Sequence, residues 1–279
     1  MDIEVTKVNA FVADGRGGNL AGVMLDAGAL STEQMQFIAT EVGASETAFV
    51  GPTEEATNHL RFFTPTVEVP LCGHATIATW WLLNSLGLQK PGEHTQMTAE
   101  GILNISLDEA GRVFMEQPPQ ELKGFVNPNI VVDALGISLD VLSKDLPPQI
   151  MQRQLMIGLT SEAALHELRP NLEKVSKVSE EYDFFGFHVY VLPENEQYLA
   201  SVRNFCPRVG IDEDAATGTG NGSFLEYLRS YNKLPEQDVY QIEQGIAMGQ
   251  HSRLFGMFRN GRVWIGGTAL PEGQLTIDI

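Results

Sequence analysis

Residues 61–76, RFFTPTVEVPLCGHAT, lead from an apolar strand through Arg and Pro into a glycine turn that opens a helix. Residues 203–221, RNFCPRVGIDEDAATGTGN, repeat this order in the second half of the chain. The two arginines are 142 positions apart, whereas Cys72 and Thr217, at the two turns, are 145 apart, so the second copy has three extra residues within 210–214. We therefore expect two halves that are copies of one fold, with the two glycine turns facing each other across a cleft.

Each glycine turn offers backbone N–H groups at a helix N-terminus. The first N–H groups of a helix lack intrahelical acceptors, and the helix dipole is positive at this end, so such turns bind anions. We therefore expect a substrate carboxylate to accept hydrogen bonds from backbone amides of the two turns, which belong to Gly73, His74, Gly218, Thr219 and Gly220.

The composition is that of a compact, acidic globule. The chain has 279 residues, of which 43% are hydrophobic and 19% charged, and its formal net charge is −18. A strongly acidic surface repels phosphate backbones and anionic lipids, so we expect neither nucleic acid nor a membrane as a partner. A small acidic substrate is compatible with this charge, because distant charge is screened within about 10 Å while N–H dipoles act at contact range.

Three features favour a cytoplasmic protein. The start, Met1-Asp2-Ile3-Glu4, lacks a basic region followed by a long apolar stretch, so we expect no signal peptide. The longest apolar run, residues 77–83, is far shorter than the roughly 20 residues that span a bilayer. Two cysteines fit a reducing compartment, and neither belongs to a metal-type pair, so we expect no metal.

Two hairpins are predicted, which indicates antiparallel sheet. The dipeptide Asn260-Gly261 suits the two positive φ values of a type I′ turn. Residues 108–111 form a second predicted turn. The strands that these turns connect are Leu254–Arg259 with Arg262–Gly266, and Ile102–Leu107 with Val113–Glu116.

Three helices of two kinds are predicted. Ser31 and Gln34 make a capping box before apolar residues spaced i, i+3, i+4 and i+7, which predicts an amphipathic helix over 31–43. The segments at about 74–86 and about 219–231 are apolar around most of their circumference, so they must be surrounded. The predicted fold class is α+β, with two similar lobes that each wrap a curled, mostly antiparallel sheet around a central helix.

The boundary between the lobes is predicted near residue 118. Two prolines in Gln117-Pro118-Pro119-Gln120 interrupt any strand ladder and form a short, stiff linker. The predicted domains are an N-terminal lobe, 1–118, and a C-terminal lobe, 119–279, whose last strand can pack on the first lobe.

Five short motifs, spread in order over nearly the whole chain, resemble the phenazine-biosynthesis PhzF-like isomerases. The resemblance implies a branch of the diaminopimelate epimerase and proline racemase fold, with two similar halves and the active site between them. It also implies a homodimer. The motifs are Gly18-Asn19, Ser45-Glu46-Thr47-Ala48-Phe49, Cys72-Gly73-His74-Ala75-Thr76, Glu213-Asp214-Ala215-Ala216-Thr217-Gly218 and Glu243-Gln244-Gly245.

The two turns differ in the residue that could act as a base. The thiol racemases of this fold carry one cysteine in each turn, on opposite faces of the substrate carbon. Here Cys72 fills the first position, but its counterpart is Thr217, whose hydroxyl is far too weak an acid to be a resting base near pH 7. Racemisation removes a proton on one face and returns it on the other, so we expect a same-face proton shift instead.

Glu46 matches the family's catalytic glutamate and is the predicted acid and base. A carboxyl can both accept and return a proton near neutral pH when an apolar environment disfavours its charged form. Ala48, Phe49 and Val50 supply apolar neighbours. The structural alternative is an exposed acid at a strand end, one of 36 acidic residues.

Three further residues match the family's site. His74 matches the active-site histidine, which would bind a substrate carboxylate or relay a proton, and Asp214 matches the second catalytic carboxylate. Thr219 stands where a serine or threonine hydroxyl is usual. The structural alternatives are a core or capping histidine, an aspartate that merely precedes a helix and an N-cap threonine.

Other matches are incomplete. Asn19 is predicted to line the pocket, although Leu20 stands where the family usually has proline. Cys72 is a candidate reactive thiol, because a helix N-terminus favours a thiolate, yet relatives that use glutamate often keep a cysteine there, which favours a spectator. The Arg-Pro pair common after the last motif is missing, so substrate identity stays open. Cys206 is expected to be buried and inert, and no ligand spacing connects His59, His94, His166, His188 and His251.

The leading hypothesis is a cofactor-independent isomerase that shifts a proton and a double bond along a small carboxylate-bearing substrate. One alternative is a thiol-dependent epimerase or racemase that uses Cys72. Another is a non-catalytic protein that binds small acids.

Overall fold

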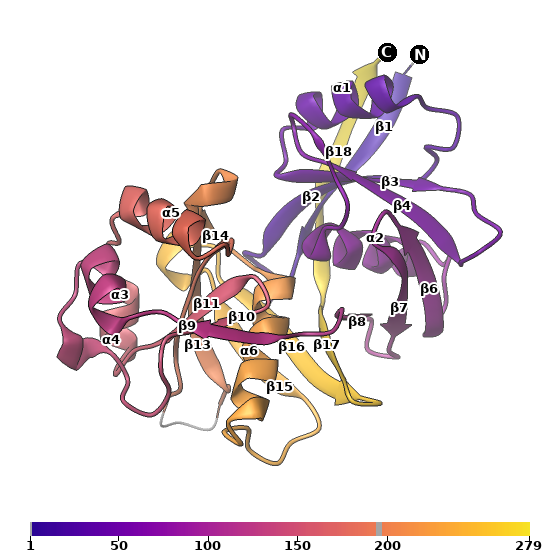
Figure 1. Cartoon of the computed structure of the whole chain (residues 1–279). Coiled ribbons are helices and arrows are strands. Elements are labelled where there is room, and N and C mark those ends of the chain that lie inside the picture. Colours follow the sequence, from indigo (N-terminus) through magenta and orange to yellow (C-terminus); the bar gives the residue numbers. More distant parts are fainter. Residues whose placement is uncertain (1, 194–196) are drawn as a thin grey trace. The chain divides into compact units, whose positions relative to one another are not determined.

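The computed structural model describes residues 2–193 and 197–279 (Figure 1). Contacts divide the chain into two compact units, Met1–Glu116 with Gly266–Ile279, and Gln117–Ile265. Each unit has curled sheet packed around a central helix, so the predicted α+β class with two similar lobes is confirmed.

The first unit holds most strands of the N-terminal half and the final strand of the chain. Its elements are β1 (Asp2–Ala10), β2 (Asn19–Met24), α1 (Thr32–Val42), β3 (Glu46–Gly51), β4 (Asn58–Phe63), β5 (Glu68–Val69), α2 (Gly73–Ser85), β6 (Gly92–Thr98), β7 (Gly101–Leu107), β8 (Val113–Glu116) and β18 (Ala269–Asp278).

Helix α2 is the central helix of this unit. Residues 74–80 are all buried, and the helix contacts β1, β2, β3, β8 and β18. Helix α1 is amphipathic and covers strands from outside, with Met35, Ile38, Ala39 and Val42 buried. Its capping box at Ser31 and Gln34 is present, as predicted. The two helices therefore enclose different faces of the curled sheet.

The second unit has the same kind of centre with a larger helical cover. Its elements are β9 (Leu122–Phe125), α3 (Pro128–Leu135), η1 (Leu139–Val141), β10 (Gln149–Met151), β11 (Gln154–Gly158), α4 (Glu162–Glu167), α5 (Leu172–Glu181), β12 (Gly186–Val191), β13 (Ala200–Cys206), η2 (Pro207–Val209), β14 (Ile211–Asp214), α6 (Gly218–Ser230), β15 (Tyr240–Gln244), η3 (Ile246–Met248) and β16 (Ser252–Arg259), while β17 (Arg262–Gly267) leads back to the first unit.

Strand β12 shows how this unit is layered. Because side chains alternate along a strand, His188 and Tyr190 face α6, where both rings contact Phe224. Phe187 and Val189 belong instead to the apolar cluster that is covered by α3, α4 and α5. The sheet of the second unit is therefore buried on both faces, with α6 on one and three helices on the other (Figure 1).

Both units have the same order and direction of strand pairing. In the first, β1–β2 is antiparallel, β2–β3 parallel, β3–β4 antiparallel, β4–β6 parallel and β6–β7 antiparallel. In the second, β10–β11, β11–β12, β12–β13, β13–β15 and β15–β16 follow the same sequence of directions. Helix α2 follows β5 just as α6 follows β14. The repeat seen in the sequence is therefore a repeat of topology.

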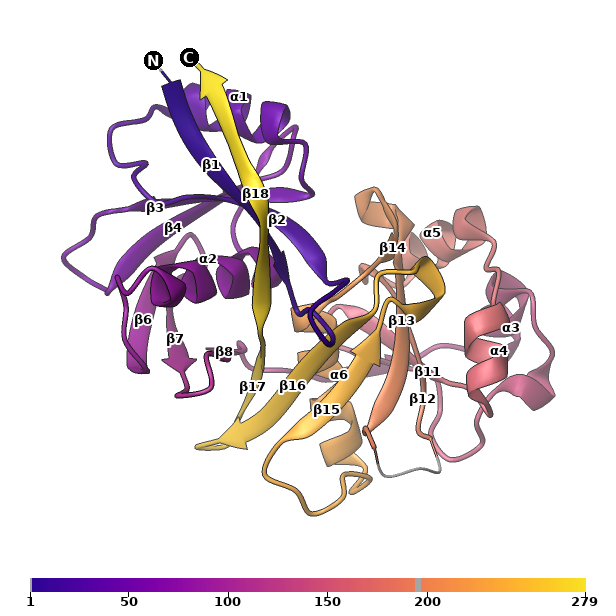
Figure 2. The same cartoon turned by 180° about the vertical axis from the view of Figure 1, so that it is seen from behind.

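Both predicted hairpins are confirmed. Asn260 and Gly261 have φ values of 51° and 78° between β16 and β17, and β7 pairs with β8 from Leu107 opposite Val113. The last strand returns to the first unit, where β18 pairs with β1 antiparallel (Figure 2). Among the described residues, no helix is long and apolar enough to cross a membrane.

Candidate active site

The first glycine turn is placed by an ion pair between strands. Arg61 on β4 donates from Nε and Nη2 to both oxygens of Glu68 on β5, each at 2.7 Å. These hydrogen bonds hold the pKa of Glu68 below its ordinary value. Strand β5 then leads into Cys72, whose extended backbone, φ −137° and ψ 119°, is the N-cap of α2.

The second turn is placed by an equivalent pair. Arg203 on β13 donates from Nε and Nη2 to both oxygens of Glu213 on β14, each at 2.8 Å. Glu68 and Glu213 are 145 positions apart, the same offset as Cys72 and Thr217. The two glycine turns therefore share one supporting device, in which a bidentate arginine fixes the strand that enters the turn.

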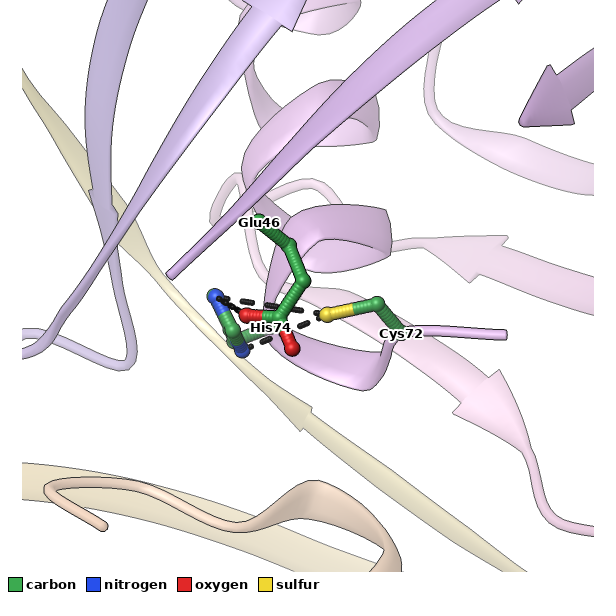
Figure 3. A group of neighbouring side chains, drawn as sticks. All are labelled: Glu46, Cys72 and His74. Atoms are coloured by element: carbon green, nitrogen blue, oxygen red, sulfur yellow. Dashed lines mark hydrogen bonds and ion pairs between the residues drawn. The ribbon is translucent and has the colours of Figure 1, made fainter. Parts of the chain in front are cut away.

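Three predicted site residues of the first unit meet at the start of α2 (Figure 3). Glu46 begins β3, Cys72 precedes α2 and His74 lies in the first turn of that helix. The Nε2 atom of His74 lies 3.3 Å from Glu46 Oε2, and Nδ1 lies 3.4 Å from Cys72 Sγ. One oxygen, one sulfur and one nitrogen of these side chains lie within 4.8 Å of one another.

Ser45 determines where His74 carries a proton. Its hydroxyl lies 3.3 Å from the Leu20 carbonyl and 3.2 Å from His74 Nε2. A carbonyl only accepts, so the serine hydroxyl donates to Leu20 and accepts from His74. Nε2 therefore carries a hydrogen, and this same nitrogen faces Glu46.

Glu46 is nearly enclosed. Its side chain is 15% exposed, and Oε2 is buried and accepts no well-formed hydrogen bond from the described residues. Most buried polar atoms have a partner, because an unsatisfied one costs free energy on folding. Glu46 Oε2 therefore combines a missing hydrogen bond with a contact of 3.3 Å to His74 Nε2.

In the second unit, Asp214 ends β14 and Thr217 is the N-cap of α6. The Thr217 hydroxyl lies 2.6 Å from Asp214 Oδ2. Thr219 lies inside the first turn of α6 and is exposed. Because Thr217 holds the N-cap position, Thr219 is not the N-cap of this helix. The carboxylate and the N-terminus of α6 are thus neighbours.

Gly218 and Gly220 are buried in the first turn of α6. A side chain at Gly220 would place Cβ 2.8 Å from Asn204 Nδ2 and 3.0 Å from His188 Nδ1, so this position requires glycine. In the first unit, Gly73 opens α2, and Asn19 begins β2 next to Leu20, the acceptor of the Ser45 hydroxyl. The structure therefore brings Glu46, Cys72 and His74 into contact, and it describes Asp214 and its turn within the other unit.

Two other titratable groups are buried in the second unit. Cys206 is buried as expected, and burial raises its pKa to about 12, which disfavours the thiolate. Burial also lowers the pKa of His188 to about 3, although a hydrogen bond with Asn221 opposes the shift. Both groups therefore stay neutral near pH 7.

A hollow of about 460 Å³ in the second unit lies away from these residues. It includes Gln241 and Glu243 of β15, whose side chains point opposite to that of Gln244. No predicted site residue lines it. The lining residues are Gln197, Tyr198, Gln241, Glu243, Ile246, His251 and Arg253.

Three kinds of supporting contact lie outside the predicted site residues. Ser45 belongs to one of the motifs, and its hydroxyl contacts His74. The pairs of Arg61 with Glu68 and of Arg203 with Glu213 could have been found, because both acids keep the offset of the repeat. Gln244 belongs to the last motif, and its side chain contacts Thr217. Such contacts depend on side-chain direction, which a motif does not encode.

Comparisons with known proteins cover nearly the whole chain. A family model described as PhzC-PhzF, phenazine biosynthesis-like protein, matches residues 8–273. The uncharacterized isomerase YddE of Escherichia coli (strain K12) is 33% identical over 265 residues, which cover 90% of this chain and 88% of that protein. The trans-2,3-dihydro-3-hydroxyanthranilate isomerase of Pseudomonas aeruginosa is 29% identical over 257 residues, 89% of this chain and 87% of that protein.

Solved structures share the fold over the full length. The phenazine biosynthesis protein of the PhzF family from Bacillus anthracis superposes with a TM-score of 0.89 at 27% identity and covers all of both chains. The hydroxyproline epimerase from Agrobacterium vitis superposes with a TM-score of 0.64 at 12% identity and covers 99% of this chain and 92% of that one. The second likeness concerns the fold alone.

Proposed function

Since this chain belongs to the PhzC-PhzF, phenazine biosynthesis-like family and is an isomerase, we propose that it shifts a proton, and with it a double bond, within a small carboxylate-bearing substrate. The reaction needs no cofactor in this proposal, and Glu46 is both acid and base. The observation that carries it is the buried Glu46 Oε2, which lacks a well-formed hydrogen bond from the described residues and lies 3.3 Å from His74 Nε2.

The topological repeat supports a single base. Thr47 pairs with Phe63 in the first unit and Phe187 with Phe205 in the second, so the residues before them, Glu46 and Gly186, occupy equivalent positions. A side chain at position 186 would place Cβ 2.1 Å from a backbone oxygen. The second unit therefore has no carboxylate where Glu46 stands, and Thr217 replaces the thiol at its turn.

The remaining roles follow from the chemistry of the turns. The imidazole of His74, whose Nε2 hydrogen is donated to Ser45, lies 3.3 Å from Glu46 Oε2 and limits the movement of that carboxylate. The backbone N–H groups of Gly73 and His74 bind the substrate carboxylate and stabilise negative charge that develops as the proton leaves. The proposed contacts from other elements are Asn19, Asp214, Gly218, Thr219 and Gly220, and Cys72 is a spectator.

The first compound to test comes from a relative. The Pseudomonas aeruginosa protein is named for trans-2,3-dihydro-3-hydroxyanthranilate, which is both unsaturated and a carboxylic acid. We propose an unsaturated acid of this general kind.

The decisive experiment measures proton exchange at carbon. The purified protein is incubated in D₂O with trans-2,3-dihydro-3-hydroxyanthranilate and with a panel of cyclic and acyclic unsaturated acids, and deuterium uptake and isomerisation are followed by NMR. We expect Glu46→Gln to lower the rate about 100-fold or more, the usual contribution of a general acid–base group. Glu54→Gln, which changes an exposed acid of the same unit in the same way, is the matched control.

The same experiment separates the alternatives. Full turnover by Glu46→Gln together with loss of activity in Cys72→Ser would replace this mechanism with the thiol-dependent one. Binding of acids by the wild-type protein without any exchange of their carbon-bound protons would make the protein a binder.

Two properties stay predictions. The homodimer expected from the family resemblance can be checked by sedimentation at several concentrations, and the cytoplasmic location by fractionation. Neither outcome alters the assignment of Glu46.

A further inference from the structure

Gln244, the last residue of β15, contacts the second glycine turn through its side chain. It is fully buried, and its carboxamide makes four hydrogen bonds. Nε2 donates to the Asp214 carbonyl at 2.8 Å and to Thr217 Oγ1 at 3.0 Å. Oε1 accepts from the Thr217 backbone N–H at 3.2 Å and from Asn221 Nδ2 at 2.7 Å.

The direction of each of these hydrogen bonds is determined by the backbone. The Asp214 carbonyl can only accept, so the atom that faces it is the amide nitrogen of Gln244, and the Thr217 N–H can only donate, so the atom that faces it is the amide oxygen. Nothing depends on a choice between two flipped amides. The second hydrogen on Nε2 is then committed to Thr217 Oγ1.

This donor fixes the threonine hydroxyl in turn. Because Thr217 Oγ1 already accepts from Gln244, its own hydrogen is directed to Asp214 Oδ2, 2.6 Å away. We infer that Gln244 is a positioning residue, which acts through Thr217 to hold Asp214 as an oriented hydrogen-bond acceptor at the start of α6. Its part in turnover rests on the function proposed above, whereas the hydrogen-bond relay rests on geometry alone.

The backbone after Gln244 fits this role. Gly245 has a φ of +77°, and a side chain there would place Cβ 2.2 Å from the Gln250 oxygen and 2.8 Å from the Ala215 oxygen. The end of β15 is therefore packed directly against the segment that joins Asp214 to α6. This close approach requires glycine at position 245. The four hydrogen bonds of the Gln244 carboxamide hold that side chain in place.

The first unit has no such relay among the described residues. Asn58 pairs with Gln96 where Ala200 pairs with Ile242, so the position equivalent to Gln244 is Thr98. Thr98 donates to the Gly101 carbonyl and does not reach the turn. Gln96 contacts the helix farther along, at Thr76 and Trp80. The relay thus belongs to the unit that carries Asp214.

Substitutions that preserve shape test the relay. Gln244→Met removes both donors and the acceptor, and Thr217→Val removes the hydroxyl, while Thr217→Ser keeps it. We expect kcat to fall about tenfold or more in Gln244→Met and in Thr217→Val, with a smaller change in KM, and to be largely retained in Thr217→Ser. Because both residues act through Asp214, the double variant should lose little more than either single variant.

A second measurement needs no turnover. Hydrogen exchange of the Thr217 amide, observed by NMR, should be slow in the wild type and in Gln154→Met, the buried-glutamine control from β11 of the same unit. It should become fast in Gln244→Met, and the carboxyl-carbon signal of Asp214 should shift. These signals decide about the relay even if no tested acid is a substrate.

Several results would overturn the inference. Unchanged Thr217 exchange and an unchanged Asp214 signal in a folded Gln244→Met protein would refute the relay. Additive losses in the double variant, or a kcat within twofold of wild type despite lost amide protection, would show that Gln244 does not act on Asp214.

Discussion

His188 is a buried imidazole whose properties follow from its surroundings. Nδ1 lies 3.0 Å from the Asn204 amide, and Nε2 makes no well-formed hydrogen bond among the described residues, although the Asn221 side chain is close enough to oppose the pKa shift. Burial disfavours the imidazolium and lowers the pKa to about 3, well below the ordinary value of 6.5. The folded protein therefore keeps His188 neutral at pH values where an unfolded chain would protonate it.

We predict that this residue contributes to acid sensitivity. Above pH 6.5 both states are neutral at His188, and as the pH falls toward 3 the unfolded state alone gains a proton. The free energy of unfolding then decreases, by at most about 1.4 kcal/mol per pH unit from this group. Urea unfolding of the wild type between pH 7.5 and 4 should show a steeper decline than that of His188→Met.

The control for this prediction is His59→Gln, a histidine outside the buried network. Its pH profile should follow that of the wild type. Parallel curves for the wild type and His188→Met would contradict the prediction.

Single residues differ in how far sequence predicts them. The contact of Glu46 with His74 was expected, because both belong to motifs with an assigned role. The sequence could not predict that Ser45 contacts Nε2 of His74, or that Gln244 orients the hydroxyl of Thr217. Each contact depends on which face of a strand or turn the side chain occupies.

At the scale of elements, α1 is specified locally. Ser31 Oγ accepts from the Gln34 N–H at 3.3 Å, and the Gln34 side chain accepts from the Ser31 N–H at 2.9 Å. Gly43, with φ of 66°, ends the helix in the left-handed conformation. Local signals of this kind are visible in sequence, and the prediction of 31–43 agrees with Thr32–Val42 because both ends carry one.

Ser31→Ala should destabilise the first unit by about 1 kcal/mol, since it removes one acceptor from the orphan N–H groups of α1. The change would be measured as a lower urea midpoint of the first unit's transition. Ser31→Asp keeps an acceptor and should stay close to wild type. Equal midpoints for Ser31→Ala and wild type would show that the capping box adds no stability.

Other elements are not specified locally. Strands β5 and β14 have two and four residues, too short for a periodic pattern to reveal. Their positions depend on Arg61 and Arg203, which reach them from neighbouring strands. The parallel pairs β2–β3 and β4–β6 likewise connect segments that no turn joins, so sequence periodicity gives their existence without their register.

At the scale of the whole molecule, the first unit depends on the end of the chain. Strand β18 pairs with β1 along its length, from Asp2 opposite Asp278 to Ala10 opposite Ala269, and it also contacts α2. The repeat in the sequence predicted two similar lobes. It could only suggest that the last strand packs on the first lobe, because two strands so far apart in the sequence are joined by no turn motif that would reveal their pairing.

We predict that a chain truncated after Thr268 loses the fold of its first unit. Without β18, the backbone groups of β1 that face it lose their partners, and α2 loses part of its cover. Limited proteolysis should cleave within residues 2–116 and spare residues 117–265, whose contacts are mostly their own. A chain truncated only after Ile277 is the control, and equal protection of both units in the longer truncation would refute the prediction.

The position of β18 also sets an order on biosynthesis. A ribosome releases the first unit's opening strands early, yet the strand that must lie beside β1 is translated only after the whole second unit. Every residue of the second unit has by then left the exit tunnel or is about to. The first unit is thus mostly synthesised first, but it can complete its sheet only after β18 has been synthesised.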